Sequence, residues 1–197
     1  MKFYDWMVSI MKKIPTLFER VFENKRVVGI TDKITPGMEW VLDGEGIATI
    51  KIDGSCCAII NGTFYKRYDA KKGKNPPNGA IACCDPDPVT GHHPHWVPVD
   101  FYNPADKWFI EAYKNSPKKS DGTYEAIGPH FQGNPYKLEK DILEPHGLKK
   151  VQLDRSFEGI KRYLENANCE GIVFWLNDQP MCKIKRSDFG FEWPVKN

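Results

Sequence analysis

The sequence lacks the features of a membrane or secreted protein. It contains no window of about 18 apolar residues, the length that a transmembrane helix requires. Its first residues, MKFYDWMVSIMKKIPTLF, are interrupted by Asp5 and Lys12-Lys13 and therefore make a poor signal peptide. We expect instead an amphipathic helix over residues 1–13 and an intracellular, cytoplasmic chain. We also expect no membrane contact and no obligate protein partner.

An excess of charge of one sign is also missing. The 197 residues include 28 Lys and Arg and 26 Asp and Glu, which gives a net charge of +2. A protein that coats nucleic acid non-specifically neutralises many phosphates, so this class is excluded, whereas a local basic site is not. With 41% hydrophobic and 27% charged residues, the composition is that of a globular domain and excludes a disordered or collagen-like chain.

The six cysteines do not form the framework of a secreted, disulfide-bonded domain. Four of them occur as the adjacent pairs Cys56-Cys57 and Cys83-Cys84, and neighbouring cysteines cannot easily bridge each other. We therefore expect a reduced chain. His92-His93 and His95 follow the second pair closely, but these adjacent residues lack the usual gap of about two to four residues between zinc ligands. We expect a packed loop here rather than a zinc site.

The local patterns predict many strands and a few helices. Asn61-Gly62, flanked by Ser55–Ile60 and Thr63–Tyr68, is the strongest short hairpin signal in the chain. The other expected strands are Met38–Ile50, Thr123–Ile127, Gly171–Leu176 and Met181–Arg186, and the expected helices are Asn103–Asn115, Leu138–His146 and Ser156–Asn166. Because no internal repeat or linker interrupts these elements, the sequence predicts one α+β domain over residues 1–197.

The sharpest local feature is a lysine, Lys51, that stands two residues before the turn Asp53-Gly54. A free lysine is neutral in only roughly 1 part in 2,500 at pH 7. A nucleophilic lysine therefore requires neighbouring cations or desolvation to lower its pKa. Taken alone, the pattern is more typical of a turn with a solvated lysine.

Strand pairing supplies a context for this lysine. If Asn61-Gly62 is a two-residue turn, Arg67 lies opposite Cys56, near the start of the strand that follows Lys51. If the last hairpin has its loop centred on Asp178-Gln179, Lys183 opposes Phe174 and Lys185 opposes Ile172. Because side chains alternate between faces, Glu170, Lys183 and Lys185 then share one face. Such a face suits Mg²⁺ and phosphate, although an exposed charged face is an equally good interpretation.

In this order along the chain, the motifs resemble the covalent nucleotidyltransferase superfamily of ligases and capping enzymes. The residues that carry the resemblance are Lys51-x-Asp53-Gly54, Arg67, Glu125, Glu170-Gly171 and Lys183-x-Lys185. Longer stretches, among them GEGIATIKIDGSCC, YKRYDAKKGK, DPVTGHHPHWVPV, GTYEAIGPHFQGNPY, EGIVFW and KIKRSDFGFEW, resemble small ATP-dependent 5′–3′ RNA ligases. This family includes the compact vertebrate RNA ligase and bacterial, phage and viral relatives. The resemblance covers roughly Ile14 to Trp193.

The resemblance implies a nucleotidyltransferase domain of antiparallel sheets flanked by helices. It implies that Lys51 attacks the α-phosphate of ATP and becomes a lysyl-AMP. AMP then passes to an RNA 5′-phosphate, and a 3′-hydroxyl displaces it, as in RNA repair. The implied nucleotide-binding residues are Ile50, Asp53, Gly54, Arg67, Glu125, Glu170, Lys183 and Lys185.

The resemblance also assigns individual roles. Arg67 and Glu125 would contact the ribose hydroxyls, and Lys183 and Lys185 would bind the α-phosphate and lower the pKa of Lys51. Glu170, with Glu125 as a second contributor, would hold Mg²⁺, for which Mn²⁺ could substitute. The family often has a polar residue where Ile50 stands. An aromatic that stacks on adenine is not clearly placed; Phe131 is a candidate, with core packing as the alternative.

Two further expectations concern the polymer. The basic segment Lys66–Lys74, with Lys66, Lys71, Lys72 and Lys74, is a candidate RNA contact, and a solvated loop is the alternative. A second basic cluster, Lys114, Lys118 and Lys119, is a weaker candidate. Because few residues follow Lys185, we expect no C-terminal oligonucleotide-binding barrel, and because few precede Lys51, we expect ATP rather than NAD.

Three other functions fit parts of the sequence. A capping-type guanylyltransferase would use the same lysine chemistry with GTP, and a DNA ligase would prefer nicked duplex DNA. A module that binds RNA ends without catalysis would need none of this chemistry. The complete set of motif residues favours an enzyme over such a module.

Overall fold

A computed structural model of the chain describes residues 13–24, 26–88, 90–117 and 119–195. The helix expected over residues 1–13 lies outside the described residues except at its last position. Within the described residues, the chain divides into two compact units: unit 1 contains residues 53–146, and unit 2 contains residues 13–52 and 147–195. Among the described residues, no helix has the length and apolar character needed to cross a membrane.

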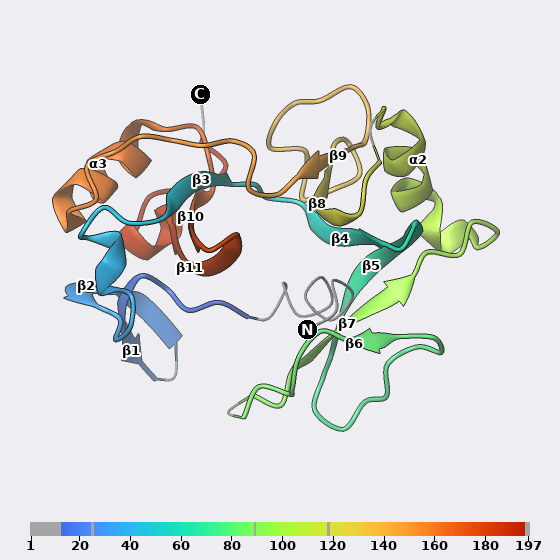
Figure 1. The fold of residues 1–197 in the computed structure, drawn as a ribbon, viewed down its shortest axis with the longest axis horizontal. Coiled ribbons are helices and arrows are strands. Elements are labelled where there is room, and N and C mark those ends of the chain that lie inside the picture. Colours follow the sequence, from blue (N-terminus) through green and yellow to red (C-terminus); the bar gives the residue numbers. More distant parts are fainter. Residues whose placement is uncertain (1–12, 25, 89, 118, 196–197) are drawn as a thin grey trace. The chain divides into compact units, whose positions relative to one another are not determined.

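Unit 1 is built on one six-stranded antiparallel sheet, with the strand order β6-β7-β5-β4-β8-β9 (Figure 1). Its strands are β4 (Ser55–Ile60), β5 (Thr63–Ala70), β6 (Ile81–Ala82), β7 (His93–Pro98), β8 (Gly122–Ile127) and β9 (Ile142–Pro145). A short 3-10 helix, η2 (Pro104–Asp106), leads into the helix α2 (Lys107–Asn115). The sequence predicted this helix from Asn103, whose side chain accepts a hydrogen bond from the backbone N–H of Ala105 at 3.0 Å.

The central hairpin of unit 1 is the one that the sequence predicted. Asn61 and Gly62 have φ values of 49° and 73°, as a two-residue type I′ turn requires. The Asp121 carboxylate accepts hydrogen bonds from both of their backbone N–H groups, at 2.9 and 3.0 Å. The strands pair in the predicted register, with Ile60 opposite Thr63 and Cys57 opposite Lys66.

The main core of unit 1 joins the sheet to α2. Buried Cys57, Phe64, Ala112 and Tyr124 belong to it, and Phe131 is only 5% exposed within it. The Phe131 ring packs edge-on against Phe109 of α2, with ring centroids 5.3 Å apart. This placement supports the packing role for Phe131 rather than stacking on adenine.

One helix expected in unit 1 is absent, because residues 138–146 contain a strand instead. In β9, Leu143 opposes Ala126 and Glu144 opposes Glu125, so this segment extends the sheet beyond β8. The apolar residues of the segment suit either element, and the exposed edge of β8 favours the strand.

Unit 2 contains a three-stranded sheet, in the order β11-β10-β3, and a separate two-stranded hairpin, β1-β2. Its elements are β1 (Phe18–Glu23), β2 (Arg26–Ile34), η1 (Glu39–Val41), β3 (Ile47–Lys51), α3 (Phe157–Asn166), β10 (Gly171–Leu176), β11 (Gln179–Lys185) and η3 (Arg186–Phe189). The strand predicted over Met38–Ile50 is therefore wrong in its first half. Gly44 and Gly46, with φ values of 86° and 65°, turn the chain between η1 and β3.

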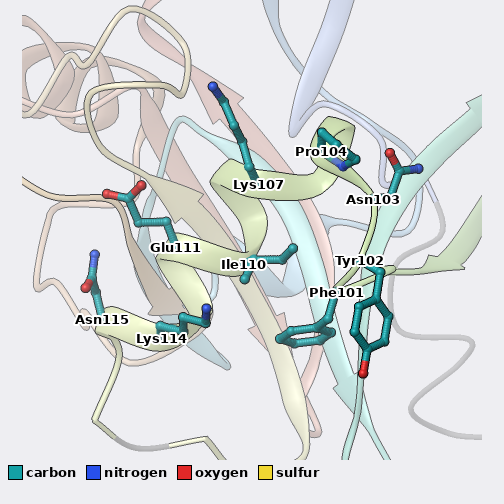
Figure 2. Close-up of a pocket in the computed structure, with 9 residues that line it drawn as sticks. All are labelled: Phe101, Tyr102, Asn103, Pro104, Lys107, Ile110, Glu111, Lys114 and Asn115. Carbon is teal, nitrogen blue, oxygen red and sulfur yellow. The ribbon is translucent and has the colours of Figure 1, made fainter.

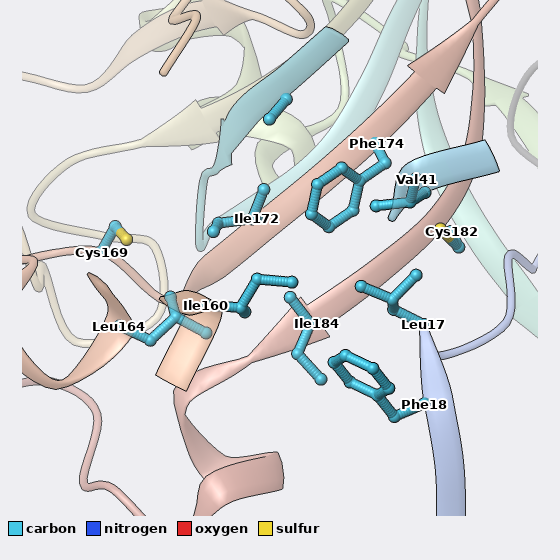
Figure 3. Packing of buried hydrophobic residues seen from close by; sticks show 11 residues of the cluster. Leu17, Phe18, Val41, Ile160, Leu164, Cys169, Ile172, Phe174, Cys182 and Ile184 are labelled. Carbon is cyan, nitrogen blue, oxygen red and sulfur yellow. The ribbon is translucent and has the colours of Figure 1, made fainter. Parts of the chain in front are cut away.

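The core of unit 2 lies against one face of this sheet (Figure 3). Ile172 and Phe174 of β10 and Ile184 of β11 are fully buried there, together with Leu164 of α3. The helix α3 was predicted almost to the residue. The side chain of Ser156 accepts a hydrogen bond from the backbone N–H of Gly159 at 3.1 Å and caps the helix.

The last hairpin has a different register from the predicted one. Its turn is Asn177-Asp178, with φ values of 51° and 60°, and one extra residue of β11 forms a bulge opposite Phe174 and Trp175. As a result Lys183 opposes Val173, and Lys185 opposes Gly171. The predicted partners Phe174 and Ile172 were wrong by one residue. Pro180 has no N–H to donate, and prolines within sheets are largely confined to edges and bulges.

Candidate active site

Three lysines of unit 2 extend from the two outer strands of the three-stranded sheet on the same face. Gly171 of the central strand β10 opposes Lys51 of β3 on one side and Lys185 of β11 on the other. A Cβ atom on Gly171 would come within 2.2 Å of the Ile184 carbonyl oxygen, so only glycine fits between the two strands. Lys183 lies on this face two residues before Lys185.

Glu170, directly before β10, joins two of these lysines. Its carboxylate accepts from the Lys51 ammonium at one oxygen and from the Lys185 ammonium at the other, each at 2.5 Å. Glu170 is 7% exposed. A buried carboxylate is stable only when it is paired, and here the pairing holds both ammonium groups on one carboxylate.

Lys183 is surrounded by positive charge. Burial, followed by the charges of Lys51, Lys185 and Arg20, lowers the pKa of Lys183 to about 8, while the charge of Glu170 acts in the opposite direction. Its backbone is fixed as well, because its N–H donates to the Pro15 carbonyl at 3.0 Å. Lys183 is therefore a cation whose proton dissociates just above neutral pH.

The end of β11 is anchored by buried charged groups. The backbone N–H of Lys185 donates to the Asp188 carboxylate at 2.8 Å. The buried Arg186 guanidinium donates to the carbonyl oxygens of Leu164 and of Ala167, the latter at 2.7 Å. These bonds connect the strand that carries Lys183 and Lys185 to the end of α3, and so restrict its position.

Unit 1 carries the other predicted nucleotide-binding residues. The backbone N–H of Asp53 donates to the Tyr136 hydroxyl at 2.7 Å. A Cβ atom on Gly54 would lie 2.4 Å from the Ala126 carbonyl oxygen and 2.8 Å from Cγ of Glu125. Glycine is therefore required here because the chain passes directly against β8 beside Glu125.

Arg67 and Glu125 lie in one row across three strands. Cys56 of β4 opposes Glu125 of β8, and the confirmed register of the β4-β5 hairpin places Arg67 opposite Cys56. A hydrogen bond joins Arg67 to the Cys56 thiol, whose pKa is raised mainly by burial and next by the charge of Glu125. Arg67 also lies 3.7 Å from the Asp69 carboxylate. Residues in one row of a sheet point to the same face, so a guanidinium and a carboxylate flank the thiol.

His146, which follows β9 two residues after Glu144, also reaches Glu125, and the sequence did not identify it as a site residue. Its Nε2 lies 2.9 Å from the Glu125 carboxylate, while its Nδ1 is buried without a hydrogen-bond partner among the described residues. The residue was hidden by the prediction of a helix over Leu138–His146. Read as a strand that pairs with the edge of β8, the same segment would have placed His146 opposite Thr123, two residues from Glu125 and on the same face.

The predicted site residues therefore fall into two sets. Unit 2 brings together Lys51, Glu170, Lys183 and Lys185, and unit 1 contains Asp53, Gly54, Arg67 and Glu125. Since Glu170 and Glu125 belong to different units, a metal site formed by both stays a prediction. The side chain of Ile50 packs against the core of unit 2, on the opposite face of β3 from Lys51.

The basic segment Lys66–Lys74 also divides in two. The Lys66 ammonium pairs with Asp106, which is 2% exposed and also accepts from the backbone N–H of Asp100. Lys71, Lys72 and Lys74 are exposed after the end of β5. Lys66 thus has a structural partner, whereas the three loop lysines are placed to meet a ligand from solvent.

Three proteins named RNA ligase 1 are similar to the chain. The zebrafish (Danio rerio) protein is 27% identical over 53% of this chain, and the orangutan (Pongo abelii) and rat (Rattus norvegicus) proteins are 29% and 24% identical over 76% of it. The chain spans 43% of the length of the zebrafish protein and 69% of each of the other two. No protein-family model matches the chain. The chain is therefore a distant relative of RNA ligases.

Proposed function

We propose that the chain is an ATP-dependent RNA ligase that joins RNA 3′-hydroxyl and 5′-phosphate ends through a lysyl-AMP on Lys51. The observation that carries this proposal is the convergence of Lys51 and Lys185 on the buried carboxylate of Glu170, with Lys183 on the same face. Such a cluster provides a nucleophile together with fixed cations for a phosphate. The similarity to proteins named RNA ligase 1 supports RNA as the polymer.

In the first step, the neutral amine of Lys51 attacks the α-phosphorus of ATP after its proton has passed to solvent. A nitrogen–phosphorus bond forms, the nitrogen loses a second proton to solvent, the bond from the α-phosphorus to the bridging oxygen of the β-phosphate breaks, and pyrophosphate leaves. Lys183 and Lys185 stabilise the negative charge that develops on the α-phosphate oxygens. Glu170 keeps the amine of Lys51 in a fixed position before the reaction.

A divalent cation fits the donors of this site. Glu170 is a buried carboxylate, and Mg²⁺ is commonly held by one or two carboxylates together with the phosphates of a nucleotide. Glu170 would hold Mg²⁺ or Mn²⁺, and Glu125 is a second candidate ligand. The bound ion would supply charge stabilisation at the phosphates.

Two transfers follow from the lysyl-AMP. An oxygen of the RNA 5′-phosphate attacks the AMP phosphorus, the bond to Lys51 breaks as its nitrogen takes up a proton from solvent, and an RNA-adenylate forms. The RNA 3′-hydroxyl then attacks the 5′-phosphate phosphorus, loses its proton to solvent and displaces AMP. Arg67 and Glu125 are the proposed contacts to the ribose hydroxyls of the nucleotide, and Lys71, Lys72 and Lys74 are proposed contacts to the RNA backbone.

The proposal is tested by the intact mass of the protein after incubation with ATP and Mg²⁺. We expect the mass to increase by one AMP in the wild type and in Lys150→Ala, which removes an exposed lysine of unit 2. No increase is expected for Lys51→Ala. A wild-type protein that stays unmodified would exclude the covalent mechanism.

The same incubation with GTP, an assay for joining of RNA and DNA ends, and an assay for RNA binding separate the alternatives. Labelling by GTP in place of ATP would identify a guanylyltransferase. If ATP labels the protein but only nicked duplex DNA is joined, the chain is a DNA ligase. RNA binding without labelling by either nucleotide would identify a binding module.

A further inference from the structure

Unit 1 has a pocket of about 430 Å³ that is lined by none of the proposed nucleotide-binding residues, although Lys114, a weaker candidate for RNA contact in the sequence, is among its lining. The loop of residues 101–104 forms one part of its wall, and side chains of α2 form the other (Figure 2). The residues that matter most are two aromatic residues of the loop, Phe101 and Tyr102, and two lysines of the helix, Lys107 and Lys114.

Tyr102 is the most unusual residue of this pocket, because it is 96% exposed although its backbone is held by hydrogen bonds. Its backbone N–H donates to the Asp100 carboxylate at 2.9 Å, and the N–H of Asp100 donates to the buried Asp106 at 2.9 Å. The N–H of Asn103 donates to the Asp100 carbonyl at 3.0 Å. The Tyr102 ring contributes little to folding, yet its attachment is held in place, which reduces the entropy lost when a ligand binds.

Phe101 adds a second aromatic surface. Its ring packs edge-on against Tyr113 of α2, with centroids 5.6 Å apart and an angle of 84° between the planes. The residue nevertheless keeps 46% of its surface exposed. Exposed aromatic rings on a rigid support are the surfaces on which proteins stack the bases of single-stranded nucleic acids.

The charges around these rings match the same ligand. Lys107 and Lys114 are seven residues apart on α2, which separates them by about 10 Å along the helix axis. Outside the lining, the Lys119 ammonium lies 4.6 Å above the Tyr113 ring. Among the described residues that line the pocket, Glu111 is the single acidic one, and its carboxylate can accept from the amino group of a base.

We propose that this pocket binds a single-stranded segment of RNA, with a base stacked on Tyr102 and phosphates beside Lys107 and Lys114. The identity of the polymer rests on the proposed function. The basic residues at both ends of α2 and the fully exposed ring favour a nucleic acid over a protein partner, for which a larger apolar surface would be expected.

Fluorescence anisotropy with a labelled, 5′-phosphorylated, single-stranded RNA tests the stacking. We expect Tyr102→Ala to weaken binding about 5- to 150-fold, the range that loss of one stacked base produces. Tyr102→Phe should bind as tightly as the wild type, because it keeps the ring. Phe22→Ala removes another exposed aromatic residue, 62% exposed in unit 2, and should have no effect.

The salt dependence of the same affinity tests the lysines. Each phosphate contact to a single strand contributes a slope of about 0.7 to the decrease of log K with log salt. Lys107→Gln and Lys114→Gln should each reduce the slope by about this amount. Lys33→Gln, which removes an exposed lysine of β2, should leave it unchanged.

Lysyl-AMP formation, measured in parallel, separates this inference from the proposed function. The inference is supported if Tyr102→Ala loses RNA affinity but is labelled by ATP like the wild type. If the variant binds RNA normally while labelling proceeds, the pocket has another ligand, such as a protein, and the inference is overturned. If the wild type is not labelled but its RNA affinity depends on Tyr102, the ligase proposal is wrong, whereas the inference that the pocket binds RNA is supported. A wild type that binds no single-stranded RNA overturns the inference in either case.

Discussion

In unit 2, Lys51 and Lys185 donate to one buried carboxylate, whereas in unit 1 Lys71 and Lys74 stand exposed beyond the end of β5. The first arrangement fixes the ammonium groups on strands whose backbones are anchored on both sides. The second leaves long side chains free to follow a ligand from solvent. Covalent transfer requires a nucleophile in a fixed position, whereas binding a flexible polymer requires only that positively charged side chains can reach its phosphates.

The two regions also differ in how each lysine depends on its neighbours. In unit 2 the positive charges act on one another, and the pKa of Lys183 is lowered to about 8 by burial and by Lys51, Lys185 and Arg20. Lysines exposed to water are screened from each other. Substitutions in the charged cluster of unit 2 should therefore change both the rate of lysyl-AMP formation and the free energy of unfolding. Substitutions of the exposed loop lysines of unit 1 should change neither strongly.

The largest effect is expected for Glu170→Gln. This change removes the charge that holds Lys51 and Lys185 in place and also removes the candidate metal ligand. We expect the rate of lysyl-AMP formation to decrease about 1,000-fold, the upper range for loss of one preorganised electrostatic contact. The rate is measured by quenched mass spectrometry at saturating ATP.

The matched control for this prediction is Glu165→Gln, which changes an exposed glutamate of α3 in the same unit. Its rate should equal that of the wild type. Circular dichroism of Glu170→Gln shows whether unit 2 is still folded. A folded Glu170→Gln protein that forms lysyl-AMP within about tenfold of the wild-type rate would show that the carboxylate does not position the nucleophile.

The second prediction concerns Lys66. This residue lies in unit 1, yet it is paired with a buried carboxylate, as Lys51 and Lys185 are in unit 2. Lys66→Met leaves Asp106, 2% exposed, without its cation. We expect the free energy of unfolding to decrease by about 3 kcal/mol, as for other broken buried pairs. Urea denaturation measures this change.

Lys71→Met is the control for Lys66→Met. It removes an exposed lysine five residues further along, and its effect should stay within about 0.5 kcal/mol. Equal stability of the two variants would mean that Lys66 belongs with the exposed loop lysines.

The sequence predicted the elements whose signals are local. Asn61-Gly62 specifies its own turn, and Ser156 caps its own helix, so both were placed correctly. The strand β9 was missed because the edge of β8, rather than the residues of β9, favours an extended chain. The β1-β2 hairpin was not anticipated either; in β1 only Phe18 is buried, so the strand gives little periodic signal.

The candidate site also shows that features set by contacts between strands could not be predicted from local patterns. Lys51, Glu170, Lys183 and Lys185 were selected from a local pattern, from strand pairing and then from a resemblance, and unit 2 does bring them together. The register used to place Glu170 on the strand face was nevertheless wrong by one residue, because a bulge beside Pro180 shifts β11. Glu170 reaches the lysines from the position just before β10. A bulge depends on how two strands meet, which spacing along one strand does not reveal.

The smallest effect is expected for Lys183→Met, and its sign is opposite to that of Lys66→Met. The pKa of Lys183 is about 8 in the folded protein and 10.5 in an unfolded chain. Below about pH 8 both states carry the proton, and the folded state bears the full unfavourable charge. Between about pH 8 and 10.5 only the unfolded state keeps it, so this group makes the wild type more stable as the pH rises.

Lys183→Met should therefore be more stable than the wild type at pH 7, by about 1 kcal/mol, while its lysyl-AMP formation is slower. The difference in stability should shrink as the pH rises from 8 to 10, because the wild-type lysine then loses its charge. Thermal unfolding without nucleotide, measured at several pH values, provides the test, with Lys33→Met of β2 as a control without pH dependence. If Lys183→Met is less stable than the wild type at pH 7, packing of the lysine stem outweighs the repulsion among the cations. The lysines of the two units would then differ in where their ammonium groups are held, and not in how strongly the cations destabilise the folded state.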